Sequence, residues 1–203
     1  LGGFAFGAER ITMQVLGLKN IREATMFPRD MERVDVRLST IQARKTDSKD
    51  PHLTPFKKII AILDNKNIEY QLYEHENVYT SEQAAKIRSD VSMHQGAKAL
   101  ILQADKEFIL YVLPGDQRAN LDKLKTYLKV NRLAMASKES VKIKTGLEVG
   151  SIPPFGSVIG LRTILDASIS DNEEIAFNAG RLDRSIKMRY QDFIAIEQPE
   201  IVS

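Results

Sequence analysis

The chain has 203 residues, of which 43% are hydrophobic, 28% are charged and none is cysteine. This composition excludes a disordered chain, and the lack of cysteine excludes disulfides, thiolate nucleophiles and cysteine zinc sites. No run of about 18 apolar residues occurs and no signal peptide precedes the first strand, so we expect a cytoplasmic protein that does not contact a membrane. The net charge of +2 does not by itself indicate a nucleic-acid partner.

Residues 1–35 read as a glycine-rich strand, a helix and an ordered tail. Ile11, Val15 and Leu18 form a helical stripe that Gly17 ends. Residues 36–52 are polar and show no apolar periodicity, which predicts a linker. Because the chain opens on Leu1 inside a motif, we expect it to be a fragment of a longer protein.

Residues 53–198 are expected to form the second domain, in which helices and strands mix without strict βαβ alternation. Thr54 is a plausible N-cap with Pro55 at the first helical position. We expect helices from residue 55, from Thr80 or Ser81, over 121–128, near 137–144 and at 190–194. Strands are expected at 68–73, 158–165, 175–178 and 185–188, and a hairpin joins strands around 98–102 and 108–113.

Lys98 is the single lysine in an apolar run over residues 96–102. In an extended strand it shares a face with Leu100 and Leu102, which places an ammonium group beside buried leucines. An unpaired buried charge is expensive, so Lys98 either reaches water at the strand end or is held for a purpose. The run alone favours the first interpretation.

Conventional catalytic motifs are absent from the sequence. The histidines His52, His75 and His94 show no metal spacing, and no nucleophile elbow, Walker loop or dinucleotide fingerprint occurs. We therefore expect no metal and no cofactor. A rigid glycine- and proline-rich loop at 146–156 and the strand end at Asn178 remain, and glycine there lets backbone N–H groups face a ligand.

Several ordered motifs between residues 54 and 195 resemble the YbaK/ProX family, which comprises the prolyl-tRNA synthetase editing domain and its free-standing deacylase relatives. The motifs are Glu74-His75 to Thr80-x-x-x-Ala84, Gly96-Ala97-Lys98, Leu113-Pro114-Gly115-Asp116, the G-x-x-x-P loop at 150–154 with Phe155-Gly156, and Asn178-Ala179-Gly180 with Ser185-Ile186-Lys187. The resemblance implies an α+β, or mixed α/β, fold with a mixed, partly barrel-like β-sheet and surrounding helices.

The family's deacylases hydrolyse the ester between a wrong amino acid and the terminal adenosine of tRNA. The resemblance makes Lys98 the essential lysine and adds Gly150, Ser151 and Pro154 as catalytic loop residues. It implies that substrate is bound by His75, Thr80, Phe155, Gly156, Asn178, Gly180 and Ser185. The expected partner is the acceptor end of aminoacyl-tRNA, with phosphates taken by basic groups at 123–144 and 181–189.

The first segment resembles motif 3 and the C-terminal tail of a class II aspartyl- or asparaginyl-tRNA synthetase, through the run GxERxxM…GLxNIRExxxFPRD. Arg10 stands at the position of the family's ATP-phosphate arginine, here as a vestige. Because a class II site needs two further motifs, we do not expect this chain to activate an amino acid. Two alternatives remain, a non-catalytic tRNA-binding domain and a parent protein that is an aspartate-tRNA ligase. The sequence indicates neither the edited amino acid nor the oligomeric state.

Overall fold

The computed structural model describes residues 54–78, 83 and 90–203, all within one compact unit, Thr46–Ser203. The synthetase-like segment with Arg10, the linker, and the expected helix at Thr80 or Ser81 lie outside the described residues.

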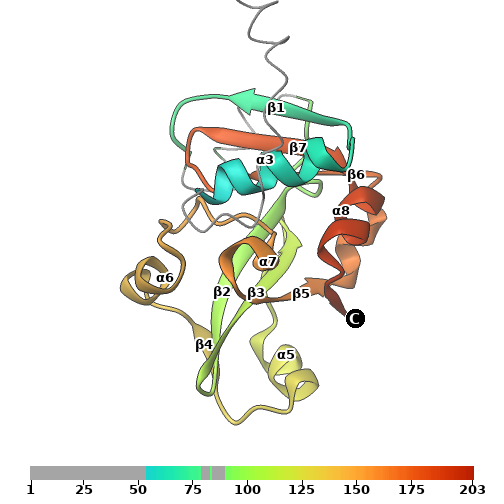
Figure 1. The fold of residues 1–203 in the computed structure, drawn as a ribbon. Coiled ribbons are helices and arrows are strands. Elements are labelled where there is room, and N and C mark those ends of the chain that lie inside the picture. The colour runs from blue at the N-terminus through green and yellow to red at the C-terminus, as the bar shows by residue number, and fades with distance from the viewer. Residues whose placement is uncertain (1–53, 79–82, 84–89) are drawn as a thin grey trace, which may run out of the picture. The chain divides into compact units, whose positions relative to one another are not determined.

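The described strands form two open sheets (Figure 1). The smaller sheet is antiparallel, in the order β1 (Tyr70–Glu74), β7 (Arg184–Arg189), β6 (Glu174–Asn178). The larger is mixed, in the order β4 (Leu133–Met135), β2 (Ala97–Ala104), β3 (Glu107–Pro114), β5 (Arg162–Asp166), β8 (Glu200–Val202). In it β3 and β5, and β5 and β8, run parallel, while β2 pairs antiparallel with β3 and β4. The expected mixed α/β architecture is confirmed, and the described strands do not close into a barrel.

Helices surround these sheets (Figure 1). The described helices are α3 (Pro55–Asn65), α5 (Leu121–Leu128), α6 (Lys138–Thr145), α7 (Gly156–Ile159), α8 (Tyr190–Glu197) and the 3₁₀ helix η2 (Ala167–Asp171). Thr54 caps α3 by accepting a hydrogen bond from the Lys57 N–H at 3.4 Å. Among the described helices none is long and apolar enough to cross a bilayer.

The strand expected over 158–165 is only partly correct. Residues 156–159 form the single turn α7, which ends at Gly160 with φ 71°, so β5 begins at Arg162. The first strand starts at Tyr70 rather than residue 68, because the chain leaves α3 through Asn67 in the left-handed region. The last helix continues beyond the expected single turn to Glu197.

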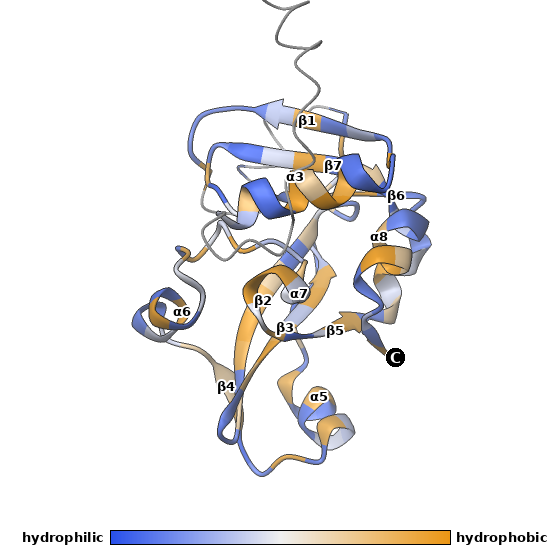
Figure 2. Cartoon of the chain, viewed as in Figure 1, coloured by the Kyte–Doolittle hydropathy of each residue, from blue (hydrophilic) through white to orange (hydrophobic). Residues whose placement is uncertain are grey.

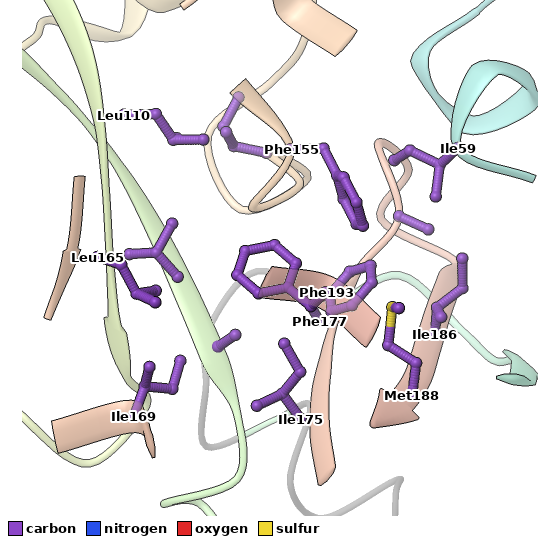
Figure 3. Close-up of a cluster of buried hydrophobic side chains, with 14 of the residues drawn as sticks. Ile59, Leu110, Phe155, Leu165, Ile169, Ile175, Phe177, Ile186, Met188 and Phe193 are labelled. Carbon is purple, nitrogen blue, oxygen red and sulfur yellow. The ribbon is translucent and has the colours of Figure 1, made fainter. Parts of the chain in front are cut away.

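The β2–β3 hairpin separates two apolar clusters, and alternate residues of each strand face opposite sides. Ala97 and Ile101 face the larger cluster, while Leu102 faces the cluster beneath α5. The larger cluster contains Phe155, whose ring meets Phe177 and Phe193 edge to face at centroid distances of 5.5 and 5.3 Å (Figure 3). Hydropathy follows this arrangement, with apolar residues along the hairpin (Figure 2). The face alternation predicted for the strand carrying Lys98 is confirmed.

Candidate active site at the junction of the two sheets

Lys98 lies half-buried near the start of β2, opposite Leu113 of β3. Its ammonium group donates to the carbonyl oxygen of Gln117 at 2.5 Å and to that of Gly115 at 3.3 Å. Both carbonyls belong to the turn that begins where Pro114 ends β3. The lysine is therefore held by the protein backbone at the strand end, which fixes the position of its positive charge.

A second group of polar side chains connects four separate segments. Asn178, at the end of β6, donates from Nδ2 to the carbonyl oxygen of Gly150 at 2.5 Å. Its Oδ1 accepts from the hydroxyl of Ser185, its partner in the β6–β7 register, at 3.1 Å. The Ser185 hydroxyl also lies 2.7 Å from Nε2 of His75, which directly follows β1. Ser185 has no exposed surface, so this network satisfies a buried hydroxyl and ties the loop to the smaller sheet.

A parallel bridge between Gly96 and Ala176 joins the two sheets at this place. The Ala176 N–H donates to the carbonyl oxygen of Gln95 at 2.9 Å. Lys98 and Asn178 each follow the bridge by two residues in the same chain direction. The bridge therefore brings the lysine and the polar network to one junction between the sheets.

The loop between α6 and α7 is buried from Ser151 to Phe155. Gly150 adopts φ 95°, a conformation that favours glycine. Ser151 is buried, and its N–H and its hydroxyl both donate to the carbonyl oxygen of Glu148, at 3.0 and 2.8 Å. Pro154 is buried and has no N–H to offer a ligand. Between Gly150 and Pro154, the N–H groups that the described hydrogen bonds do not use are those of Gly150 and Ile152.

Three residues expected at the site also make structural contacts. The Phe155 side chain has no exposed surface and packs in the core described above. The Gly156 N–H donates to the Thr163 hydroxyl at 3.1 Å, and a Cβ at this position would lie 2.2 Å from that oxygen. Gly180, with φ 81°, approaches the start of α3, where an added Cβ would lie 3.2 Å from the Phe56 nitrogen. Thr80 lies outside the described residues.

The two basic groups seen in the sequence differ in their pairing. Arg181, Arg184, Lys187 and Arg189 each form a salt bridge, and Arg181 and Arg184 share Asp183. The hydrogen bond from Arg181 is the main reason why the pKa of Asp183 is lowered to about 2. In α6, by contrast, Lys142 pairs with Glu148 at 3.7 Å, while Lys138 and Lys144 form no salt bridge with a described residue. Positive charge without a described carboxylate partner therefore lies on α6, next in the chain to the loop that carries Gly150.

Sequence reasoning did not identify the carbonyl oxygens of Gly115 and Gln117 as partners of Lys98, because backbone groups leave no residue signature. No described set of three or more His, Asp or Glu side chains is arranged to hold a metal ion. A hollow of about 650 Å³ lies at the far tip of the hairpin, lined by Asp105, Lys106 and Glu107 among others. That tip is six strand residues from Lys98, about 20 Å away.

Comparison with known proteins identifies the family of the chain. The aminoacyl-tRNA editing domain model matches residues 75–196, and the model of class II tRNA synthetases (D, K and N) matches residues 1–31. The multifunctional Ser/Thr-tRNA deacylase ProXp-y of Escherichia coli K12 is 34% identical over 152 residues, which cover 72% of this chain and 90% of that protein. The prolyl-tRNA editing protein ProX of Acetoanaerobium sticklandii is 26% identical over 140 residues, covering 66% and 85% of the two chains.

A solved structure described as a candidate trans-editing enzyme for prolyl-tRNA synthetase superposes with a TM-score of 0.63 at 19% identity. The superposition covers 73% of this chain and 95% of that one, so the two share a fold. The family match and the similarity to a named deacylase define the class, which is that of editing enzymes that remove amino acids from tRNA. The chain belongs to the aminoacyl-tRNA editing domain family.

Proposed function

We propose that the junction of the two sheets is where the chain hydrolyses the ester between a wrongly attached amino acid and the terminal adenosine of tRNA. The observation that carries this proposal is the ammonium group of Lys98, held by two carbonyl oxygens two residues after the bridge that joins Gly96 to Ala176. Asn178, which belongs to the network with Ser185 and His75, follows the same bridge on the other sheet. The family match at residues 75–196 supports it, because that range contains all four residues.

In the proposed mechanism the protein acts by positioning and electrostatics and supplies no nucleophile. Lys98 attracts the terminal phosphate or the acyl oxygen, and loop N–H groups at Gly150 and Ile152 hold the acyl group. Water, oriented by a ribose hydroxyl, attacks the carbonyl carbon. The bond between that carbon and the ribose oxygen breaks, and the oxygen leaves with a proton derived from the water. The products are a free amino acid and uncharged tRNA.

The remaining site residues receive supporting roles in this proposal. Asn178 fixes the position of the loop by donating a hydrogen bond to the Gly150 carbonyl oxygen. Ser185 and His75 fix the orientation of the Asn178 side chain. Pro154 and Ser151 keep the loop in one conformation, and Thr80 is retained from the sequence as a substrate contact. The similarity to a Ser/Thr-tRNA deacylase makes seryl and threonyl esters the first substrates to test.

The proposed tRNA contact is the basic surface of α6, defined as Lys138, Lys142 and Lys144. Its charge is suited to acceptor-stem phosphates, whereas Arg181, Arg184, Lys187 and Arg189 already have carboxylate partners. We assign residues 53–198 to the editing domain, residues 36–52 to a linker and residues 1–35 to a synthetase-like segment. A synthetase body joined through that segment would raise the effective concentration of tRNA at the editing site.

The test is release of amino acid from a panel of correctly charged and mischarged tRNAs by the full chain. Wild type is compared with Lys98→Ala and with Lys106→Ala, a control at the exposed tip of the same hairpin. Loss of a preorganised electrostatic donor costs about a hundredfold to a thousandfold in rate, so Lys98→Ala should lose that much and the control should lose nothing. Undiminished hydrolysis by Lys98→Ala overturns the assignment, and tRNA binding without any hydrolysis favours the non-catalytic alternative.

A further inference from the structure

The turn that holds Lys98 is itself held by a series of hydrogen-bonded side chains from β3, β5 and η2. The Gln117 side-chain amide lies 3.0 Å from the hydroxyl of Ser168, in η2. That hydroxyl lies 2.6 Å from Oδ1 of Asp166, and the other carboxylate oxygen of Asp166 accepts a short hydrogen bond from the Tyr111 hydroxyl. This series of hydrogen bonds thus runs from β5 and η2 to Gln117, the turn residue whose carbonyl oxygen binds the Lys98 ammonium group.

The direction of these hydrogen bonds is set by proton counting. The Asp166 carboxylate accepts from the Tyr111 hydroxyl, the Ser168 hydroxyl and the Ser168 N–H, the last at 3.0 Å. A serine hydroxyl has one proton, and at 2.6 Å that proton goes to the carboxylate. The structure places Gln117 Oε1 3.0 Å from the Ser168 hydroxyl, and exchanging the amide oxygen and nitrogen of Gln117 lets its NH₂ group donate to Ser168.

The carboxylate that anchors the chain stays ionised. Burial raises the pKa of Asp166, but the hydrogen bonds from Ser168 and Tyr111 outweigh burial and leave it below its ordinary value. The pKa of Tyr111 is raised, first by burial and then by its hydrogen bond to Asp166. At neutral pH Asp166 is therefore ionised and Tyr111 keeps its proton, as this series of hydrogen bonds requires.

We infer that Ser168 and Gln117, anchored by Asp166, are positioning residues that fix the ammonium group of Lys98 for hydrolysis. The inference rests on the proposed role of Lys98. A turn has few ladder hydrogen bonds of its own. In the turn over residues 115–117, the Gln117 N–H donates to the Pro114 carbonyl oxygen at 3.1 Å. Misplacing a catalytic group by about 1 Å can cost about a hundredfold in rate, so the side-chain anchor has a measurable catalytic value.

The experiment compares Ser168→Ala and Gln117→Ala with wild type in the deacylation assay, using the full chain. Gln117→Ala removes the side-chain anchor and retains the carbonyl that binds Lys98. We expect kcat/KM to fall about tenfold or more in each variant, because the position of the charge is disturbed. Ser168→Thr, which keeps the hydroxyl, should retain activity. Ser170→Ala is the matched control, because its hydroxyl lies in the same helix and donates only to the Ala167 carbonyl at 2.7 Å.

A double-mutant cycle separates positioning from general destabilisation. If Ser168 acts through Lys98, Ser168→Ala should not lower the residual rate of Lys98→Ala any further. An equal loss in both backgrounds overturns this inference but not the proposed function. The same holds if Ser168→Ala and Gln117→Ala keep the wild-type kcat/KM while Lys98→Ala is inactive. Full activity of Lys98→Ala instead overturns the proposed function on which the inference rests.

Discussion

The side chain of Asn178 binds the carbonyl oxygen of Gly150, and this contact joins the end of a strand to a loop 28 residues earlier in the chain. The loop reaches the junction of the sheets because an amide side chain can donate to Gly150 and accept from Ser185 at the same time. The position of the loop at Gly150 therefore depends on the Asn178 side chain.

Asn178→Asp tests this dependence with almost no change in volume. An ionised aspartate has no donor for the Gly150 carbonyl, so the loop should lose its fixed position while the Ser185 contact is retained. We expect deacylation to fall about tenfold to a hundredfold, in line with misplacement of catalytic groups. Thermal unfolding is measured in parallel, and Asn172→Asp serves as the control, because Asn172 makes its contacts at the His94 and Ile169 carbonyls. Equal losses in the two variants would contradict a specific role for the loop contact.

Gly156→Ala is expected to be among the most destabilising small substitutions in the chain. Its Cβ would lie 2.2 Å from the Thr163 hydroxyl and 2.4 Å from the Leu161 carbonyl oxygen, and the second of these is backbone that cannot turn away. Overpacking a core typically costs about 1–3 kcal/mol and sometimes more, so we expect a loss at or above the top of that range in urea unfolding.

Gly160→Ala is the matched control for that measurement. Gly160 has φ 71° and nothing within 4 Å of an added Cβ, so alanine there suffers only backbone strain of about 1–2 kcal/mol. If Gly156→Ala unfolds at the same denaturant concentration as Gly160→Ala, steric contact at Gly156 is not the reason that glycine is required.

Much of the fold could be predicted because local signals and burial agree. Thr54 and Pro55 mark the start of α3, and alternation along residues 97–102 separates the two clusters correctly. The strands β4 and β8 have three residues each, too few to show a period of two. Val158 and Ile159 favour a strand by propensity, but α7 forms because Gly160 can adopt the left-handed conformation that closes a single turn.

The candidate site was predictable as a set of residues but not as a geometry. Motif spacing identified Lys98, Asn178 and Ser185, while their partners at Gly115, Gln117 and Gly150 are backbone carbonyls that any residue could supply. Phe155 stands inside a motif, yet its ring packs against Phe177 and Phe193. A motif can therefore record what holds a loop in place as well as what touches substrate, and only tertiary structure distinguishes the two.

Acid unfolding should respond to Asp183, which lies between Arg181 and Arg184. Its folded pKa of about 2 is below the ordinary value of 3.8, so its ionised form is favoured in the folded state. The resulting stabilisation is complete above the ordinary value and is lost as the pH falls from there through about 2. Asp183→Asn should therefore flatten the stability curve in that window, measured by thermal unfolding from pH 5 downward. An unchanged slope would show that the pair with Arg181 contributes nothing to folding.

The final prediction concerns the basic surface of α6. If Lys138 and Lys144 bind tRNA phosphates, replacing both by alanine should weaken binding and reduce the dependence of log K on log salt by about 0.7–0.9 for each phosphate that is no longer neutralised. Arg189→Ala is the control, because Arg189 is equally basic but is already paired with Asp192. Binding is measured by titration of the full chain with uncharged tRNA over a series of salt concentrations. Phosphate binding requires that the salt slope falls with the α6 lysines and not with Arg189, since a merely structural role for α6 would change affinity at every salt concentration alike and leave the slope intact.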